Sequence, residues 1–148
     1  MRVIVQRSLS SSVSIDGKDV GKISRGMVLL VGFTLGDGEK EINYMVKKIV
    51  NLRIFDDENG IMNKSILDTN GEVLSISQFT LYANTNKGNR PSYVQALKSS
   101  EASKLYDLFN EKLKSYVNVK TGIFGADMLL NIQNDGPVTV CLERKGII

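Results

Sequence analysis

The longest apolar run in the chain, MVLLVGF at residues 27–33, constrains the fold more than any other segment. A continuous apolar run of this length predicts a strand that is buried within a sheet. Seven residues are too few to cross a bilayer, and the N-terminal residues lack the pattern of a signal peptide. We therefore expect a cytoplasmic protein without a membrane partner, folded as one domain over residues 1–148.

Two segments change from the period of a strand to the period of a helix. Apolar residues recur at helical spacing within residues 36–50, where Asp37 is the expected N-cap. A second apolar stripe over residues 102–116 predicts another helix, capped by Ser99 or Ser100.

Most of the remaining chain is typical of strands. Residues 12–24 predict a hairpin about the Asp16-Gly17 turn, and residues 72–83 form the clearest strand pattern. About seven strands and two helices predict a single compact, sheet-rich α/β domain with a barrel-like or layered sheet. The other segments expected as strands are 2–7, 26–34, 118–124, 127–134 and 137–143.

The chain contains no histidine and a single cysteine, Cys141. These counts exclude serine–histidine and cysteine–histidine catalysis, and they remove the commonest zinc ligand and all multi-thiolate metal sites. We therefore expect neither a metal nor a cofactor. The alternating segment around Cys141 predicts a small core residue rather than a reactive thiol, and a lone cysteine fits a reducing compartment.

The net charge of +3 and the isoelectric point near 9.0 permit an anionic partner such as RNA without requiring one. Lys87 and Arg90 lie in a polar loop and could contact phosphates. The composition of that loop alone favours a solvated surface. The acidic residues 56–58 are likewise expected in a solvated turn.

Ser77, Gln78 and Thr80 cluster at the end of the clearest strand. One interpretation is a catalytic site with Thr80 as a hydroxyl nucleophile, an amide at Gln78 and backbone N–H groups for an oxyanion. The other interpretation, which the pattern alone favours, is the polar face of a half-exposed strand. A threonine nucleophile needs an activating base, and no residue is obviously placed to supply it.

The dipeptide Gly136-Pro137 interrupts an otherwise alternating strand over residues 131–143. Ile132, Val138 and the alternate residues that follow share one face, yet proline donates no ladder hydrogen bond and glycine weakens a strand interior. The dipeptide fits a tight turn or a bulge. A cis bond is the second interpretation, although base rates favour a trans bond.

Several short motifs resemble those of the D-aminoacyl-tRNA deacylase family, and they occur in the family's order. The resemblance covers nearly the whole chain. The motifs are VQR (5–7), RIF (53–55), MN (62–63), SQFTL (77–81), RPSY (90–93), TGIFGADM (121–128) and NDGPVT (134–139).

This resemblance implies a compact, sheet-rich α/β fold that pairs as a homodimer, with the active site at the subunit interface. It also implies an esterase that removes D-amino acids from tRNA, and glycine that has been mischarged on the tRNA for alanine. The expected partners are thus the aminoacylated 3′ end of tRNA and a second copy of the chain.

The resemblance also assigns site residues. It implies a cis Gly136-Pro137 bond whose carbonyls face the substrate amine of the partner subunit's site and reject L-amino acids. Arg7 would brace that segment, and Phe124 and Met128 would lie near the terminal adenosine. The expected catalytic residues are Ser77, Gln78, Phe79 and Thr80, and the expected substrate-binding residues are Arg7, Phe124, Met128, Asn134, Gly136, Pro137, Val138 and Thr139.

Two departures from the family pattern lie outside these motifs. The segment SLSSSV at residues 8–13 is rich in serine where family members commonly carry an alanine, and the tail RKGII at residues 144–148 runs past the usual end. The first bears on strand packing, and the second bears only on the C-terminus.

The absence of histidine is compatible with this activity. An aminoacyl ester is already reactive, and the neighbouring ribose hydroxyl can assist water, so the protein must mainly orient the ester and supply an oxyanion donor. The N–H of Phe79 or Thr80 is the candidate donor. Two alternatives stay open at this stage: a non-catalytic RNA-binding protein, and a hydrolase with Thr80 as covalent nucleophile.

Overall fold

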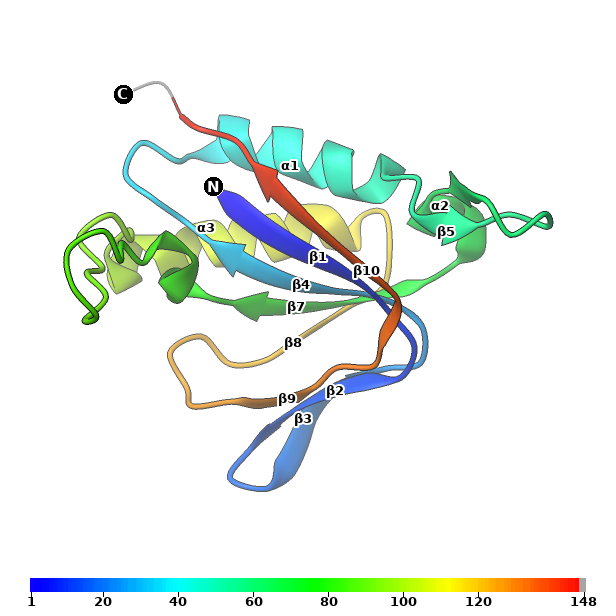
Figure 1. The fold of residues 1–148 in the computed structure, drawn as a ribbon, viewed down its shortest axis with the longest axis horizontal. Helices are drawn as coiled ribbons and strands as arrows, with labels where there is room; N and C mark the ends of the chain where they lie inside the picture. Colours follow the sequence, from blue (N-terminus) through cyan, green and yellow to red (C-terminus); the bar gives the residue numbers. More distant parts are fainter. Residues whose placement is uncertain (147–148) are drawn as a thin grey trace.

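The computed structural model describes residues 1–146, and Ile147 and Ile148 of the C-terminal tail lie outside the described residues. Its main sheet has five strands in the order β10-β1-β4-β7-β8 (Figure 1). The strands are β1 (Arg2–Ser8), β2 (Ser11–Ile15), β3 (Lys18–Ile23), β4 (Gly26–Gly32), β5 (Phe55–Asp56), β6 (Met62–Lys64), β7 (Glu72–Ser77), β8 (Val119–Thr121), β9 (Leu129–Asn131) and β10 (Asn134–Glu143), and the helices are α1 (Glu39–Asn51), α2 (Ile66–Thr69), the 3-10 turn η1 (Phe79–Tyr82) and α3 (Ser99–Lys114).

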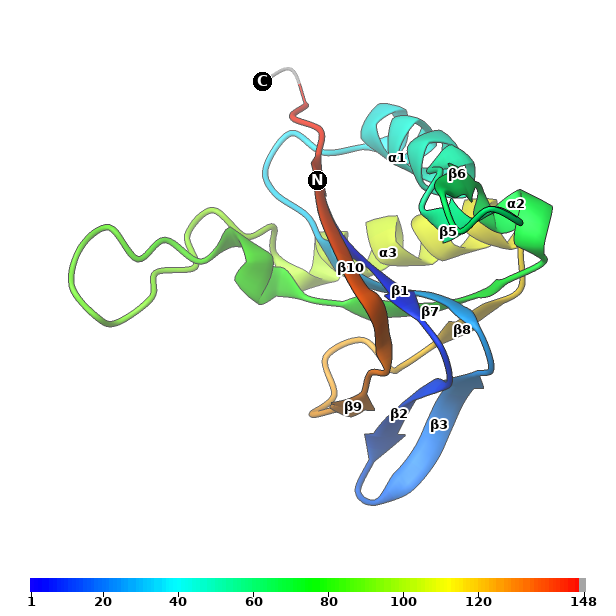
Figure 2. The ribbon, with the colours of Figure 1, turned by 45° about the vertical axis from the view of Figure 1, so that its right-hand side comes forward.

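The two long helices lie on one face of the main sheet, and the small sheet β3-β2-β9 lies on the other side (Figure 2). Each interface has its own apolar core. Residues of β1, β4, α1 and α3 form the larger core, whereas Val13 and Ile23 of the small sheet pack with Val28, Leu74 and Ile76 of the main sheet.

This layering explains why residues 27–33 are apolar without interruption. Successive side chains of a strand point to opposite faces. Met27 and Leu29 enter the core beneath the helices, while Val28 enters the core against the small sheet. Because both faces of β4 are covered, the strand is buried as predicted, and the layered sheet rather than the barrel-like one is confirmed for the described residues.

The predicted counts of elements were too low. Residues 1–146 contain ten strands and three α-helices, because the short pair β5–β6 and the one-turn helix α2 have no periodic signal. The hairpin about Asp16-Gly17 and both long helices are confirmed. Within the described residues no helix is long and apolar enough to span a membrane.

Two of the expected helix caps were wrong by one residue. Gly38 occupies the N-cap of α1, and Asp37 instead accepts hydrogen bonds from the Thr34 amide and the Met1 amine. Lys98 is the N-cap of α3, so the expected cap Ser99 is the first residue of that helix.

The alternation in β10 also decides the position of Cys141. Val138, Val140 and Leu142 pack against the larger core, as their shared face predicted. Cys141 lies on the opposite face and is exposed, so the prediction of a core cysteine was wrong. A strand with one solvent-accessible face carries every second residue outward.

Candidate active site

Three parallel strands end at one edge of the main sheet. β4 pairs with β7 and β7 pairs with β8, both in parallel, so their carboxyl ends lie together. Ligands of open α/β sheets bind outside the carboxyl ends of strands. A cleft of about 550 Å³ opens at this edge, a volume suited to a small ligand. Its lining includes Gly32, Ser77, Gln78, Phe79, Phe124 and Met128.

Backbone pairing with β4 fixes the turn that follows β7. The Gln78 amide donates to the Val31 carbonyl at 2.7 Å, and the Leu81 amide then donates back to the Gln78 carbonyl at 3.3 Å. The predicted strand over residues 72–83 therefore ends at Ser77, and the next residues form η1. This turn brings Phe79 to the cleft, where its side chain is 57% exposed.

The amides of Phe79 and Thr80 begin this turn and have no acceptor among residues 1–146. The first N–H groups of a helical turn have no partner within the turn and are left for an outside acceptor. Adjacent backbone donors beside a cleft are the arrangement that stabilises a developing oxyanion. The sequence had indicated the N–H of Phe79 or Thr80 as a candidate oxyanion donor.

Thr80 itself does not line the cleft. Its hydroxyl accepts a hydrogen bond from the side-chain amide of Gln78. No lysine, arginine or carboxylate among the described residues makes a hydrogen bond with Thr80, so no base is in place to activate the hydroxyl. The contact instead ties two residues of the turn to each other.

Aromatic residues form the remaining wall and the mouth of the cleft. Phe124 packs on Tyr106 with 5.9 Å between ring centroids, and Phe79 meets Tyr93 edge-to-face at 5.1 Å. Burial raises the pKa of Tyr106, whose protonated hydroxyl donates to the Ser75 carbonyl at 2.7 Å. Tyr106 thus connects the Phe124 loop to the strand that carries the site.

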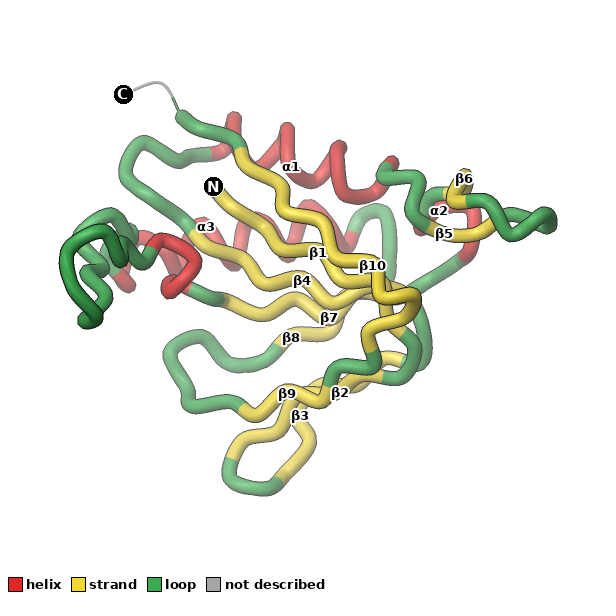
Figure 3. Tube along the Cα trace, in the orientation of Figure 1, coloured by secondary structure: helices red, strands yellow, loops and turns green. Residues whose placement is uncertain are grey.

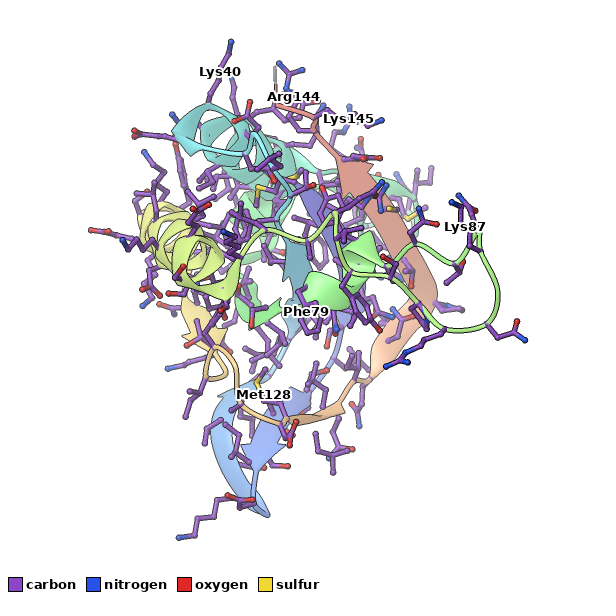
Figure 4. The ribbon with its side chains drawn as sticks, turned by 90° about the vertical axis from the view of Figure 1, so that its left-hand side faces the viewer. Lys40, Phe79, Lys87, Met128, Arg144 and Lys145 are labelled. Atoms are coloured by element: carbon purple, nitrogen blue, oxygen red, sulfur yellow. The ribbon has the colours of Figure 1, made fainter. Side chains whose placement is uncertain are left out.

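Figure 4 looks onto the end of the molecule where the cleft opens, with Phe79 near the centre and Met128 from the β8–β9 loop below it. Met128 also packs close to Gly122, where an added Cβ would lie 2.3 Å from its sulfur. Phe79 and Met128 are separated by 49 positions in sequence, yet their side chains line the same cleft.

Gly136 and Pro137 do not belong to this cleft within one chain. They lie in a bulge of β10, where the register with β1 passes from Gln6–Thr139 to Ser8–Asn134. The peptide bond between them is cis, and Gly136 has a φ of +121°. Both residues are exposed to solvent.

The side chain of Asn134 makes hydrogen bonds across the base of this bulge. Its side-chain amide donates to the carbonyls of Arg7 and Val138, both at 3.0 Å, and its side-chain oxygen accepts from Thr139 at 3.1 Å. These contacts join the two ends of the interrupted segment. Asn134, Val138 and Thr139 therefore lie with Gly136-Pro137 in the bulge and do not line the cleft that holds Phe124 and Met128.

Arg7 lies beneath the bulge and is 8% exposed. Its guanidinium donates to the carbonyl of Asp135 at 3.2 Å and to that of Ile54 at 2.9 Å, and it pairs with the Asp56 carboxylate at 3.1 Å. A planar guanidinium can hold several acceptors in fixed directions at once. Arg7 therefore contacts the backbone and the side chain of Asp135, the residue that precedes Gly136-Pro137.

Sequence reasoning missed several contributors to these two sites. Asp56, which was placed in a solvated turn, is a partner of Arg7, and Asp135 forms a second ion pair with Arg7 at 3.3 Å. Tyr93 reaches the cleft from the long segment between η1 and α3, which Figure 3 shows mostly as loop. The RPSY motif contains Tyr93 and was the available signal.

Fold and cleft together define a small α/β protein with a ligand site at the carboxyl edge of its parallel strands. The model of a protein family described as D-Tyr-tRNA(Tyr) deacylase matches residues 4–143. A D-aminoacyl-tRNA deacylase of Clostridium novyi (strain NT) is 53% identical over 146 residues, which cover 98% of each chain. The chain belongs to the D-Tyr-tRNA(Tyr) deacylase family, and it is a hydrolase.

Two solved structures share this fold. The protein titled c-Myc DNA Unwinding Element Binding Protein has a TM-score of 0.94 and 43% identity, with 99% of this chain and 100% of that chain covered. A probable eukaryotic D-amino acid tRNA deacylase has a TM-score of 0.83, with 95% and 97% covered. At 17% identity the second likeness shows the shared fold alone.

Gly32 provides a test of the turn beside the cleft. A Cβ at Gly32 would lie 2.9 Å from the Gln78 carbonyl oxygen and 3.2 Å from the Leu81 Cβ, so η1 must shift. We expect Gly32→Ala to lower deacylation of D-tyrosyl-tRNA by roughly tenfold or more, since ångström displacements of a site have effects of this size. Single-turnover rates measure the loss.

The matched control is Gly38→Ala, where the nearest atom to the added Cβ is a Glu41 oxygen at 3.9 Å. Circular dichroism should report an unchanged fold for both variants. If both variants kept the wild-type rate, the turn would not be a constrained part of the site.

Proposed function

We propose that this hydrolase cleaves the ester between a D-amino acid and the 3′ end of tRNA, in the cleft beside Ser77, Gln78, Phe79 and Thr80. The observation that carries the proposal is the pair of amides at Phe79, which lines a cleft of about 550 Å³, and at the adjacent Thr80, neither of which has an acceptor among residues 1–146. The name of the Clostridium novyi relative gives the same substrate class.

In this mechanism water adds to the ester carbonyl, and the two amides stabilise the negative charge on the carbonyl oxygen. The bond to the ribose oxygen then breaks, and that oxygen takes up a proton as the free amino acid leaves. The neighbouring ribose hydroxyl assists the attacking water. The products are the D-amino acid and tRNA, and no cofactor or protein nucleophile takes part.

A second copy of the chain would complete the site. We infer a homodimer in which Gly136-Pro137 of the partner subunit enters the cleft. The proposal is supported by the exposure of both residues, their position outside their own chain's cleft, and the rigid support from Arg7 and Asn134. An exposed backbone segment held by a buried guanidinium is suited to recognise a ligand in another subunit.

The inserted segment would select chirality. Its carbonyl oxygens hold the substrate's amino group, so the two other directions at the α-carbon are fixed. An L side chain is then driven into the backbone of the segment, whereas a D side chain points to solvent. Rejection by steric conflict gives large discrimination, and glycine, including glycine on the tRNA for alanine, passes the filter.

A panel of four substrates tests this activity. The wild-type protein should hydrolyse D-tyrosyl-, D-aspartyl- and glycyl-tRNA and leave L-tyrosyl-tRNA intact, because the filter opposes only an L side chain. Release of radiolabelled amino acid measures each rate. Fast cleavage of L-tyrosyl-tRNA would contradict the filter, and binding without cleavage of any ester would favour a non-catalytic RNA-binding protein.

Thr80→Ala separates this mechanism from a covalent one. Since no base contacts the hydroxyl, the variant should keep its rate for D-tyrosyl-tRNA within about tenfold, whereas loss of a true nucleophile lowers rates by several orders of magnitude. Mass spectrometry of quenched wild-type reactions should find no acyl-enzyme. A trapped acyl-Thr80 adduct would revive the covalent alternative.

The ribose hydroxyl is tested from the substrate side. A tRNA that ends in 2′-deoxyadenosine and carries D-tyrosine on its 3′ oxygen should bind normally but turn over slowly, because the assisting group is gone. Filter binding and single-turnover rates measure the two properties. Equal turnover of deoxy and ordinary substrates would assign the assistance to the protein.

A further inference from the structure

Five residues form a basic cluster beside the C-terminus: Lys40, Tyr44 and Lys48 of α1, with Arg144 and Lys145 of the tail. The three helical residues are spaced by four positions and therefore lie along one face of α1. At a rise of 1.5 Å per residue, Lys40 and Lys48 are about 12 Å apart along the helix axis. We call this group the tail cluster.

The tail cluster is held in place by specific contacts. The guanidinium of Arg144 lies over the Tyr44 ring at 4.7 Å from its centroid, and the Lys48 ammonium lies 5.7 Å from the same centroid. The Arg144 amide donates to the Met1 carbonyl at 2.9 Å, so the tail continues the pairing of β10 with β1. Lys40 and Lys145 are exposed.

The positive charge of the tail cluster is not neutralised by nearby acids. The carboxylates of Asp37, Glu39 and Glu143 pair with the Met1 amine at 2.7 Å, Lys112 at 2.9 Å and Arg2 at 3.2 Å. Among the described residues, no carboxylate lies within 4.0 Å of a charged nitrogen of the tail cluster. Unpaired surface cations are available to an anionic partner.

Three basic residues of the tail cluster lie at the same end of the molecule as the cleft. Figure 4 shows Lys40, Arg144 and Lys145 above Phe79 on the end of the molecule where the cleft opens, and Lys87 of the long loop to one side. A tRNA whose 3′ end occupies the cleft must leave the protein across this end. Arg144 and Lys145 also lie beyond residues 4–143, the part that the family model matches.

We propose that the tail cluster binds backbone phosphates of the tRNA acceptor stem while the aminoacylated 3′ end occupies the cleft. The inference rests on the proposed function, since it assigns a docking surface to the same substrate. Lysine and arginine contacts to phosphate supply affinity that does not depend on base sequence and that falls steeply with salt. The surface therefore acts on tRNA binding and not on ester chemistry.

The double variant Lys40→Ala/Lys145→Ala removes two exposed cations without disturbing the Arg144–Tyr44 contact. Lys18→Ala/Lys22→Ala is the matched control, since β3 lies at the far end of the molecule from α1 (Figure 1). Two substrates are compared for each protein: D-tyrosyl-tRNA, and the D-tyrosyl ester of adenosine, which has the reacting bond but no acceptor stem.

We expect the tail variant to raise KM for D-tyrosyl-tRNA roughly tenfold at 0.15 M salt, with kcat unchanged. The slope of log(kcat/KM) against log[salt] should become shallower by roughly 1.4–1.8, the range for two lost phosphate contacts. Hydrolysis of the adenosine ester should match the wild type, and the control variant should match it on both substrates.

Several results would overturn the proposal. These are unchanged tRNA kinetics in the tail variant, an equal loss on the adenosine ester, or an equal loss in the control variant. A wild-type protein that cleaves neither ester would instead reject the proposed function. In that case the Kd of uncharged tRNA tests the docking surface separately. The Kd must rise in the tail variant and stay at the wild-type value in the control variant.

Discussion

The hydrogen bond from the Gln78 amide to the Val31 carbonyl, 2.7 Å long, is the constraint on which the cleft depends. It continues the parallel pairing of β4 with β7 past Ser77 and makes the chain turn at Phe79. The position of the turn leaves the amides of Phe79 and Thr80 without acceptors among residues 1–146. Because β4 is buried on both faces, this edge of the sheet has little freedom to move.

A second rigid element is built around Arg7, on the opposite side of β4 in the strand order. The buried guanidinium and the Asn134 amide hold the Gly136-Pro137 bulge, yet the bulge stays outside the cleft of its own chain. One chain therefore carries a cleft and a firmly held bulge, and the two do not meet within that chain. In a symmetric dimer, the bulge of each copy would meet the cleft of the other copy, so two complete sites would form. This is the reason for proposing a two-subunit site.

Much of the fold was predictable because it follows from periodicity: the buried strand at residues 27–33, both long helices and the hairpin at Asp16-Gly17. The end of β7 at Ser77 could not be predicted, because residues 78–83 keep a strand-like composition. Only the hydrogen bond from Gln78 to Val31 ends the strand there. The motifs that carry the resemblance contain residues of the cleft and of the bulge. Asp56 was missed because its partner, Arg7, is 49 positions away in sequence.

Subunit complementation tests the two-subunit site most directly. Gly32→Ala alters the cleft, and Gly136→Ala alters the bulge, where an added Cβ would lie 2.8 Å from the Val138 side chain and 3.0 Å from Arg7. Each variant alone should hydrolyse D-tyrosyl-tRNA at about a tenth of the wild-type rate or less. When the two are co-refolded in equal amounts, half of the dimers are mixed and hold one intact site each, so about a quarter of wild-type activity should return. If the mixture stays as inactive as its components although mixed dimers form, the bulge does not act on the partner's cleft.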